Sequence, residues 1–151
     1  MVANVQPIYT LTPNVGLQVW LPATTANTKS DGAGTVGTDM LKLITAGANG
    51  SLINKIRFMP CASAAATATT ATVARVYVSS VGSGSTTNAD TKMIAEIALP
   101  AQTADQTTTA TNQVDVPIGV PIKSGQYIHV SMHHAAAANT SWSIVGFGGD
   151  Y

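Results

Sequence analysis

Apolar and polar residues alternate with a period of two in several short windows of the sequence. In the window 15–21 (VGLQVWL), Val15, Leu17, Val19 and Leu21 share one face. This alternation is typical of a β-strand, because successive side chains point to opposite sides of a sheet. Eight windows have strand character, with varying regularity: 15–21, 40–46, 52–59, 73–78, 92–99, 114–116, 128–132 and 142–147.

The same pattern predicts which residues face the interior. In the window 73–78 we expect Ala74, Val76 and Val78 to point inward and Arg75 and Tyr77 outward. In the other windows, we expect Met93, Ala95, Ile97 and Leu99 to point inward, Asn54, Ile56 and Phe58 to share one side opposite Lys55 and Arg57, and Trp20 and Trp142 to anchor the core.

Turn signals separate the predicted strands. Residues 31–34 form a Gly-rich loop, 47–50 (GANG) predict a hairpin, 81–90 predict a flexible surface loop, and 123–126 predict a tight turn. Pro117 ends the strand at 114–116, and a ninth strand at 5–9 would lie at an edge because of Pro7. We therefore expect an all-β fold, an antiparallel β-sandwich of jelly-roll type with about eight strands. Residues 1–12 would form an N-terminal arm and 13–151 one domain.

Two low-complexity stretches interrupt this pattern. Residues 62–72 and 101–111 consist almost wholly of small uncharged residues, with Asp105 as their one acid. They fit flexible loops. They also fit packing arms that lie flat against a neighbouring subunit, since exposed disorder normally recruits more charge or proline.

Charge is scarce along the chain. Only 9% of residues are charged, and seven basic and seven acidic residues give zero net charge. The basic residues are scattered, so we expect no nucleic-acid partner. No apolar run is long enough for a membrane span, and we expect no signal peptide. The lone Cys61 fits a small hydrophobe in a reducing compartment. A surface so poor in charge suits a protein that a partner covers.

No arrangement of reactive residues stands out. The acids are isolated, Glu96 is the only glutamate, and no nucleophile elbow or phosphate-binding loop occurs. We therefore predict a non-enzymatic protein with no catalytic residue, no bound metal and no cofactor, and a hydrolase ranks last among the functions considered.

His129, His133 and His134 form the one cluster of metal-ligand type. On a strand, His129 and His133 would lie about 13 Å apart, too far for one ion. We expect a row of polar groups on an exposed face. The alternative is a metal shared between subunits at a symmetry axis.

Tyr77 and Tyr127 are both predicted to point outward. Their amphipathic rings suit an interface or an edge. Exposed aromatic rings would also suit a platform for a sugar, so a carbohydrate-binding module stays an alternative.

Several segments resemble a known family. They are the opening residues 3–9 (ANVQPIY), the loop 31–35 (DGAGT), the run 45–51 (TAGANGS) followed by 53–57 (INKIR), the strands 73–78 and 92–99 in the same order, and 121–125 (PIKSG) before 127–130 (YIHV). Together they are similar to small virion proteins of tailed bacteriophages, the capsid decoration (cement) proteins.

The resemblance implies a β-sandwich that assembles as homotrimers on the capsid exterior and binds the major capsid protein between capsomers. The protein would be made in the host bacterial cytoplasm and would stabilise the shell, and the arm 1–12 and the stretch 101–111 would add strands to neighbouring sheets. The alternative is a carbohydrate- or receptor-binding β-sandwich module of a phage fibre or spike. The candidate capsid or subunit interface residues are Val5, Pro7, Ile8, Tyr9, Tyr77, Tyr127, His129 and His133.

Overall fold

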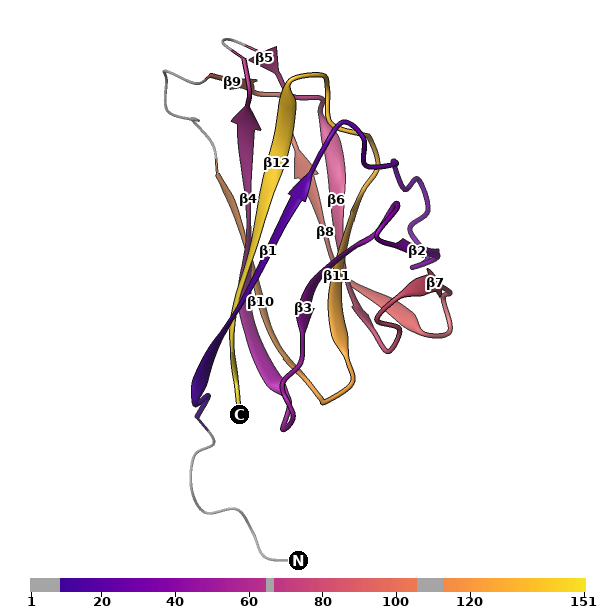
Figure 1. Cartoon of the computed structure of the whole chain (residues 1–151), viewed down its shortest axis with the longest axis vertical. Coiled ribbons are helices and arrows are strands. Elements are labelled where there is room, and N and C mark those ends of the chain that lie inside the picture. The colour runs from indigo at the N-terminus through magenta and orange to yellow at the C-terminus, as the bar shows by residue number, and fades with distance from the viewer. Residues whose placement is uncertain (1–8, 65–66, 106–112) are drawn as a thin grey trace, which may run out of the picture.

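The computed structural model describes residues 9–64, 67–105 and 113–151, and in this part of the chain all regular structure is β (Figure 1). One sheet has the strand order β1 (Thr12–Trp20), β12 (Thr140–Asp150), β4 (Ser51–Ala62) and β10 (Val114–Ile122). The second has the order β3 (Leu41–Thr45), β11 (Tyr127–Met132), β6 (Thr72–Ser79) and β8 (Thr91–Leu99). Two short pairs join β2 (Gly34–Val36) to β7 (Gly84–Thr86) and β5 (Thr67–Ala68) to β9 (Thr103–Ala104). None of the described residues forms a helix that could cross a membrane.

The eight long strands pair from the outside of the sequence inward. The first pairs with the last (β1 with β12), the second with the seventh (β3 with β11), the third with the sixth (β4 with β10) and the fourth with the fifth (β6 with β8), always antiparallel. The chain is thus one long hairpin rolled into two facing sheets, which is the jelly-roll arrangement of two Greek keys. The predicted fold class is confirmed.

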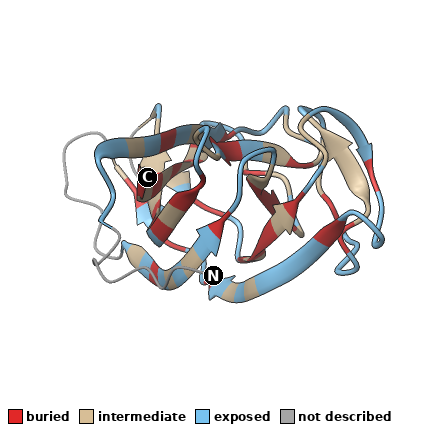
Figure 2. Cartoon of the chain, turned by 90° about the horizontal axis from the view of Figure 1, so that it is seen from below, coloured by how far each residue is buried: buried red, intermediate tan, exposed pale blue. Residues whose placement is uncertain are grey.

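The core lies between the two sheets. Its largest fully buried side chains include Trp20, Trp142 and Phe58 from one sheet and Ile44 and Met132 from the other. Seen from below, buried segments alternate with intermediate and exposed ones along the strands (Figure 2). The predicted placement of Trp20, Trp142, Ala74 and Val76 inside is therefore correct.

The predicted sides of Asn54, expected beside Ile56 and Phe58, and of Met93, expected to face inward, are wrong because β-bulges shift the alternation by one residue. In β4 the pairing with β12 jumps from Lys55 to Ile53, so Asn54 is exposed and Ile53 is buried. In β8 it jumps from Ala95 to Met93, which leaves Ile94 unpaired and turns Met93 outward, 41% exposed.

Two predictions about where strands end and how they connect are wrong. Residues 47–50 do form a tight turn, with the Gly50 N–H donating to the Gly47 carbonyl at 3.0 Å, but β3 and β4 belong to different sheets, so it is not a hairpin. Pro117 does not end a strand, since β10 continues to Ile122. It is tolerated there because β10 is an edge strand and no further strand needs its missing N–H.

Residues 81–90, expected to be a flexible loop, contain β7, which pairs with β2. We call the segments 22–40 and 80–90 the β2–β7 flap. It lies against the outer face of the β3–β11–β6–β8 sheet (Figure 1). The Asn27 N–H donates to the Met132 carbonyl at 2.9 Å, and the Thr86 hydroxyl donates to the Gly32 carbonyl at 2.8 Å. The flap gives this sheet a second covered face.

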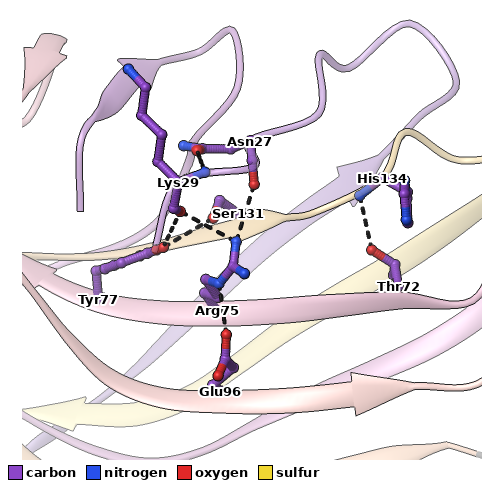
Figure 3. Close-up of polar contacts among 8 residues, drawn as sticks. All are labelled: Asn27, Lys29, Thr72, Arg75, Tyr77, Glu96, Ser131 and His134. Carbon is purple, nitrogen blue, oxygen red and sulfur yellow. Dashed lines mark hydrogen bonds and ion pairs between the residues drawn. The ribbon is translucent and has the colours of Figure 1, made fainter. Parts of the chain in front are cut away.

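Under the flap lies a layer of buried polar side chains (Figure 3). The Arg75 guanidinium, 7% exposed, donates to Glu96 at 2.8 Å and to the carbonyls of Asn27 and Lys29 at 3.2 Å each. The Tyr77 hydroxyl lies 3.3 Å from the Ser131 hydroxyl, and burial raises the pKa of the Tyr77 phenol. Arg75 and Tyr77 point away from the inter-sheet core as expected, but the flap buries both.

His129 belongs to the same layer and is fully buried. Its Nε2 lies 2.7 Å from the Val81 carbonyl, and since a carbonyl only accepts, Nε2 carries the proton of the neutral ring. Nδ1 has no hydrogen-bond partner. The Tyr127 ring stacks on the imidazole, with centroids 6.0 Å apart, and Lys42 lies over that tyrosine. Burial is the main cause that lowers the pKa of His129, so the fold favours the neutral imidazole.

The sandwich closes along one side where β1 meets β3. The Asn14 side-chain amide donates to the Thr45 carbonyl, and that of Gln18 donates to the Lys42 carbonyl, both at 2.9 Å. Between them Gly16 lies so close to β3 that a Cβ would come within 2.1 Å of the Leu43 carbonyl oxygen. The inward positions of β1 must therefore be polar or glycine, except Trp20, which enters the core.

The buried His129 predicts a loss of stability in mild acid. The unfolded chain binds a proton near pH 6.5, whereas the folded chain resists it, so the free energy of unfolding falls as the pH drops below about 6.5, by up to about 1.4 kcal/mol per pH unit. The lowered pKa values of Asp115 and Asp150 remove stability only below about pH 4, outside this window. Urea unfolding at pH 7.5 and 5.5 measures the change. His129→Gln should flatten the dependence, and His134→Gln, on the surface, should not. Equal slopes for His129→Gln and the wild type would contradict it.

Gly16→Ala should open the contact between β1 and β3, since its methyl group meets a backbone oxygen that cannot swing away. We expect a loss of about 1–3 kcal/mol in the free energy of unfolding, measured with urea at pH 7.5. Val15→Ala, on the exposed face of the same strand, serves as the control and should change it by about 0.5 kcal/mol or less. A Gly16→Ala variant as stable as the wild type would show that β3 does not restrict this position.

Candidate functional site

Exposed large apolar side chains gather on one stretch of the described chain. Six of the eight lie between Tyr9 and Leu21: Tyr9 (72% exposed), Leu11 (81%), Val15 (52%), Leu17 (70%), Val19 (45%) and Leu21 (47%). We call Val15, Leu17, Val19 and Leu21 the β1 stripe. They share one face, as the sequence predicts, but that face is turned to solvent. A contiguous exposed apolar patch of this kind marks an interaction surface.

The stripe points outward because the other face of β1 packs against β3 and donates hydrogen bonds to it. Asn14, Gly16 and Gln18 are the positions that the close approach to β3 requires, and they alternate with the apolar residues. Since a strand has a period of two, placing these three inward places Val15, Leu17 and Val19 outward. A slip of one residue would hide the stripe but would force Leu17 against the backbone of β3.

The neighbouring strand extends the apolar surface. On β12, Val145 lies opposite Leu17 and Phe147 lies opposite Val15, and both are half-buried. The Phe147 ring lies beneath two cations, with Lys55 Nζ 5.2 Å and the Arg57 guanidinium 5.8 Å from its centroid. The ring thereby connects the stripe to a charged region on β4.

The charged side chains of this region pair with one another. Asp115 on β10 accepts from Lys55 at 2.9 Å and from Arg57 at 2.6 and 2.8 Å. The hydrogen bonds from Arg57 and Lys55 hold the pKa of the Asp115 carboxyl well below its usual range, and the bond to Asp115 raises the pKa of Arg57. This outer face therefore runs from an apolar edge to an ion cluster with one excess positive charge.

Two shallow hollows lie beside the stripe and share Leu21. The first, of about 410 Å³, is lined by Leu17, Gln18, Val19, Leu21, Ser143 and Ile144. The second, of about 310 Å³, is lined by Leu21, Pro22, Ser63, Asn139, Thr140 and Ser141. They continue the surface along β1 toward the end of the sandwich that carries the β12 N-terminus. The arrangement offers apolar and uncharged polar groups, which suits an extended segment of another protein more than a small charged ligand.

The predicted interface residues differ in how far they are exposed. Tyr9 is exposed and adjoins the stripe. Tyr77 and His129 are fully buried under the flap, which corrects their assignment to a surface. Tyr127 is half-buried, with Lys42 over its ring and Gly82 against its edge. Val5, Pro7 and Ile8 lie outside the described residues.

Burial of Tyr77 removes the aromatic pair on which the carbohydrate-binding alternative depends. The expectation of an exposed histidine row is likewise wrong for His129. His133 and His134 follow the end of β11 at Met132, and their rings meet edge to face with centroids 4.7 Å apart. Among residues 9–64, 67–105 and 113–151, no group of three or more His, Cys, Asp or Glu side chains could hold a metal ion.

Sequence reasoning identified the apolar face of β1 but not its exposure. The available signal was Gly16, since a glycine inside a strand often marks the close approach of another backbone. Asn14 and Gln18 suit either solvent or hydrogen bonds to that backbone. From the sequence of β1 alone, either of its two faces could be turned toward the interior. The position of β3 determines which one is.

No protein-family model matches the sequence, and no curated protein matches it. Two viral structures are similar to the chain in outline. A chain of the cyanophage Pam1 capsid asymmetric unit is 10% identical with a TM-score of 0.40, over 99% of this chain and 94% of that one. A chain of infectious bursal disease virus, Gx strain, is 13% identical with a TM-score of 0.27, over 98% of this chain and 35% of that one. With TM-scores below 0.5, both likenesses are too loose to say what this chain does, and its function has to be inferred from its own surface.

Proposed function

We propose that this protein is a phage head decoration (cement) protein, which binds the exterior of the capsid between capsomers and stabilises the shell. The observation that carries the proposal is the β1 stripe, an uncharged apolar surface on an edge strand of the sandwich. The partner is the major capsid protein, and the working form is a homotrimer, as the sequence resemblance implies.

The energetics of the stripe suit such a role. Fully burying a Val or Leu side chain is worth about 1.5–3 kcal/mol, so covering four side chains that are about half exposed is worth roughly 1 kcal/mol each. One copy would bind the shell with moderate affinity. A trimer presents the stripe three times, and linked sites strengthen one another through effective concentration. Many copies that bind only the assembled shell stabilise it by mass action.

The scarcity of charge supports the same role. With 9% charged residues and zero net charge, the surface gains little from long-range attraction and has little repulsion to overcome when copies pack closely. Three of the charged side chains, Lys55, Arg57 and Asp115, already pair with one another on one sheet and leave one excess positive charge. Close packing of many identical copies on a shell is compatible with this surface.

Binding to heads tests the proposal. Purified protein is mixed with phage heads that lack it, and the bound fraction is measured by co-sedimentation, together with the temperature at which the heads release their DNA. We expect the wild type to run as a trimer, to bind at a fixed number of copies per head and to raise the release temperature.

A stripe variant gives the matched comparison. Leu17→Ser with Val19→Ser removes two exposed side chains without touching the core and should weaken binding more than tenfold, since a tenfold change corresponds to 1.4 kcal/mol. Ile94→Ser, an exposed residue of similar character on the other sheet, should bind like the wild type. A monomeric wild type that does not sediment with heads would exclude the proposed function.

A further inference from the structure

We propose that the free edge of β1 accepts an extended strand of the shell protein, which adds to the sheet β1–β12–β4–β10 as a fifth strand. This inference rests on the proposed function and specifies how the protein binds. It follows from a comparison of the four sheet edges, because an open edge with unpaired N–H and C=O groups is a template for another chain unless the sequence protects it.

The β1 edge is long, regular and unprotected. In the described chain, Thr12–Trp20 pairs with β12 alone, through nine consecutive residue pairs without a register shift. The strand contains no charged residue, and its one proline, Pro13, lies second from its start. Over 14–20, β1 has no charge, proline or bulge that would block an added strand, and the close approach of β3 at Gly16 limits only the size of the inward side chains of that strand.

The β3 edge is covered. This strand has only five residues, and the carbonyls of Lys42 and Thr45 already accept hydrogen bonds from the side chains of Gln18 and Asn14. Its pairing with β11 shifts register, and a bridge between Val36 and Met40 brings β2 alongside its start.

The β8 edge is protected by charge and by a bulge. Lys92 and Glu96 are exposed on this strand, and Ile94 is the extra residue that breaks its pairing with β6. Bulges and charged side chains are the usual means by which proteins keep an edge from pairing. Its two exposed apolar residues, Met93 and Ile94, therefore lie on an edge of irregular geometry.

The β10 edge is protected by its backbone. Pro117 and Pro121 lack the N–H that a partner strand would use, and the register shifts between Pro117 and Val120, where Gly119 has a φ of 60°. Of the four edges in the described chain, β1 alone is both regular and free of such devices.

The surroundings of β1 define the chemistry of the added strand. Its outward side chains would lie about 5 Å from Val15, Leu17 and Val19, which favours apolar and β-branched residues at alternate positions. The hollow of about 410 Å³ beside Leu17 and Val19 has room for one larger apolar side chain. Its inward side chains would face the seam with β3 near Gly16, so they must be small. A charged segment would find no counterion within β1.

Hydrogen–deuterium exchange of β1 distinguishes strand addition from contact through side chains alone. In an edge strand about half of the amides point away from the sheet and exchange freely. We expect peptides covering 12–21 to exchange as a mixture of protected and free amides in the unbound protein. In the head-bound protein the free class should slow at least tenfold. Peptides covering β8 and β10 should not change to this extent.

A variant with a charge beside the β1 edge completes the test. Leu17→Lys places a charge beside the edge while its methylene stem still covers the apolar surface, and we expect head binding at least tenfold weaker, with Ile94→Lys on β8 as the matched control that binds normally. Far-ultraviolet circular dichroism confirms that both variants fold. Binding without new protection in β1, or normal binding by folded Leu17→Lys, would overturn the inference and leave the proposed function standing. A wild type that does not bind heads would overturn both.

Discussion

The contact between β1 and β3 determines which face of β1 is exposed to solvent. A sandwich of two four-stranded sheets must close at its sides, and here the backbones of two edge strands approach so closely that only glycine fits at position 16. The amides of Asn14 and Gln18 satisfy the carbonyls of β3 on either side of that point. Because Asn14, Gly16 and Gln18 must face β3, the apolar residues between them lie on the other face of β1, in contact with solvent. The candidate interaction surface is thus a consequence of how the fold closes.

Much of the fold can be predicted from the sequence, because each of its eight long strands falls on a window marked by two-residue periodicity or by a run of apolar residues. The errors have local causes. A bulge at Asn54 and another at Ile94 reverse the alternation within a strand, and no residue type marks either position. The turn at 47–50 has the residues of a hairpin, but the same residues also serve a crossing between sheets. Pro117 is compatible with a strand only because that strand proves to be an edge.

The candidate site was harder to predict than the fold, because burial of a sheet face depends on distant segments. Tyr77 and His129 alternate with core residues and so face away from the core, which in a simple sandwich means solvent. The β2–β7 flap, formed by two segments about 50 residues apart, covers them with backbone carbonyls that pair with Arg75 and Tyr77. This polar layer explains why a chain with few charges still buries an arginine and a histidine.

The pairing of the first strand with the last has a consequence for synthesis. On the ribosome the chain emerges from its N-terminus, so β12 (Thr140–Asp150), which lies between β1 and β4, is synthesised after all the other described strands. Until those residues leave the exit tunnel, two long apolar strands lack the neighbour that joins them, and contacts between such distant residues form slowly. Until then the nascent chain is exposed to premature association, and its low charge provides little repulsion against it.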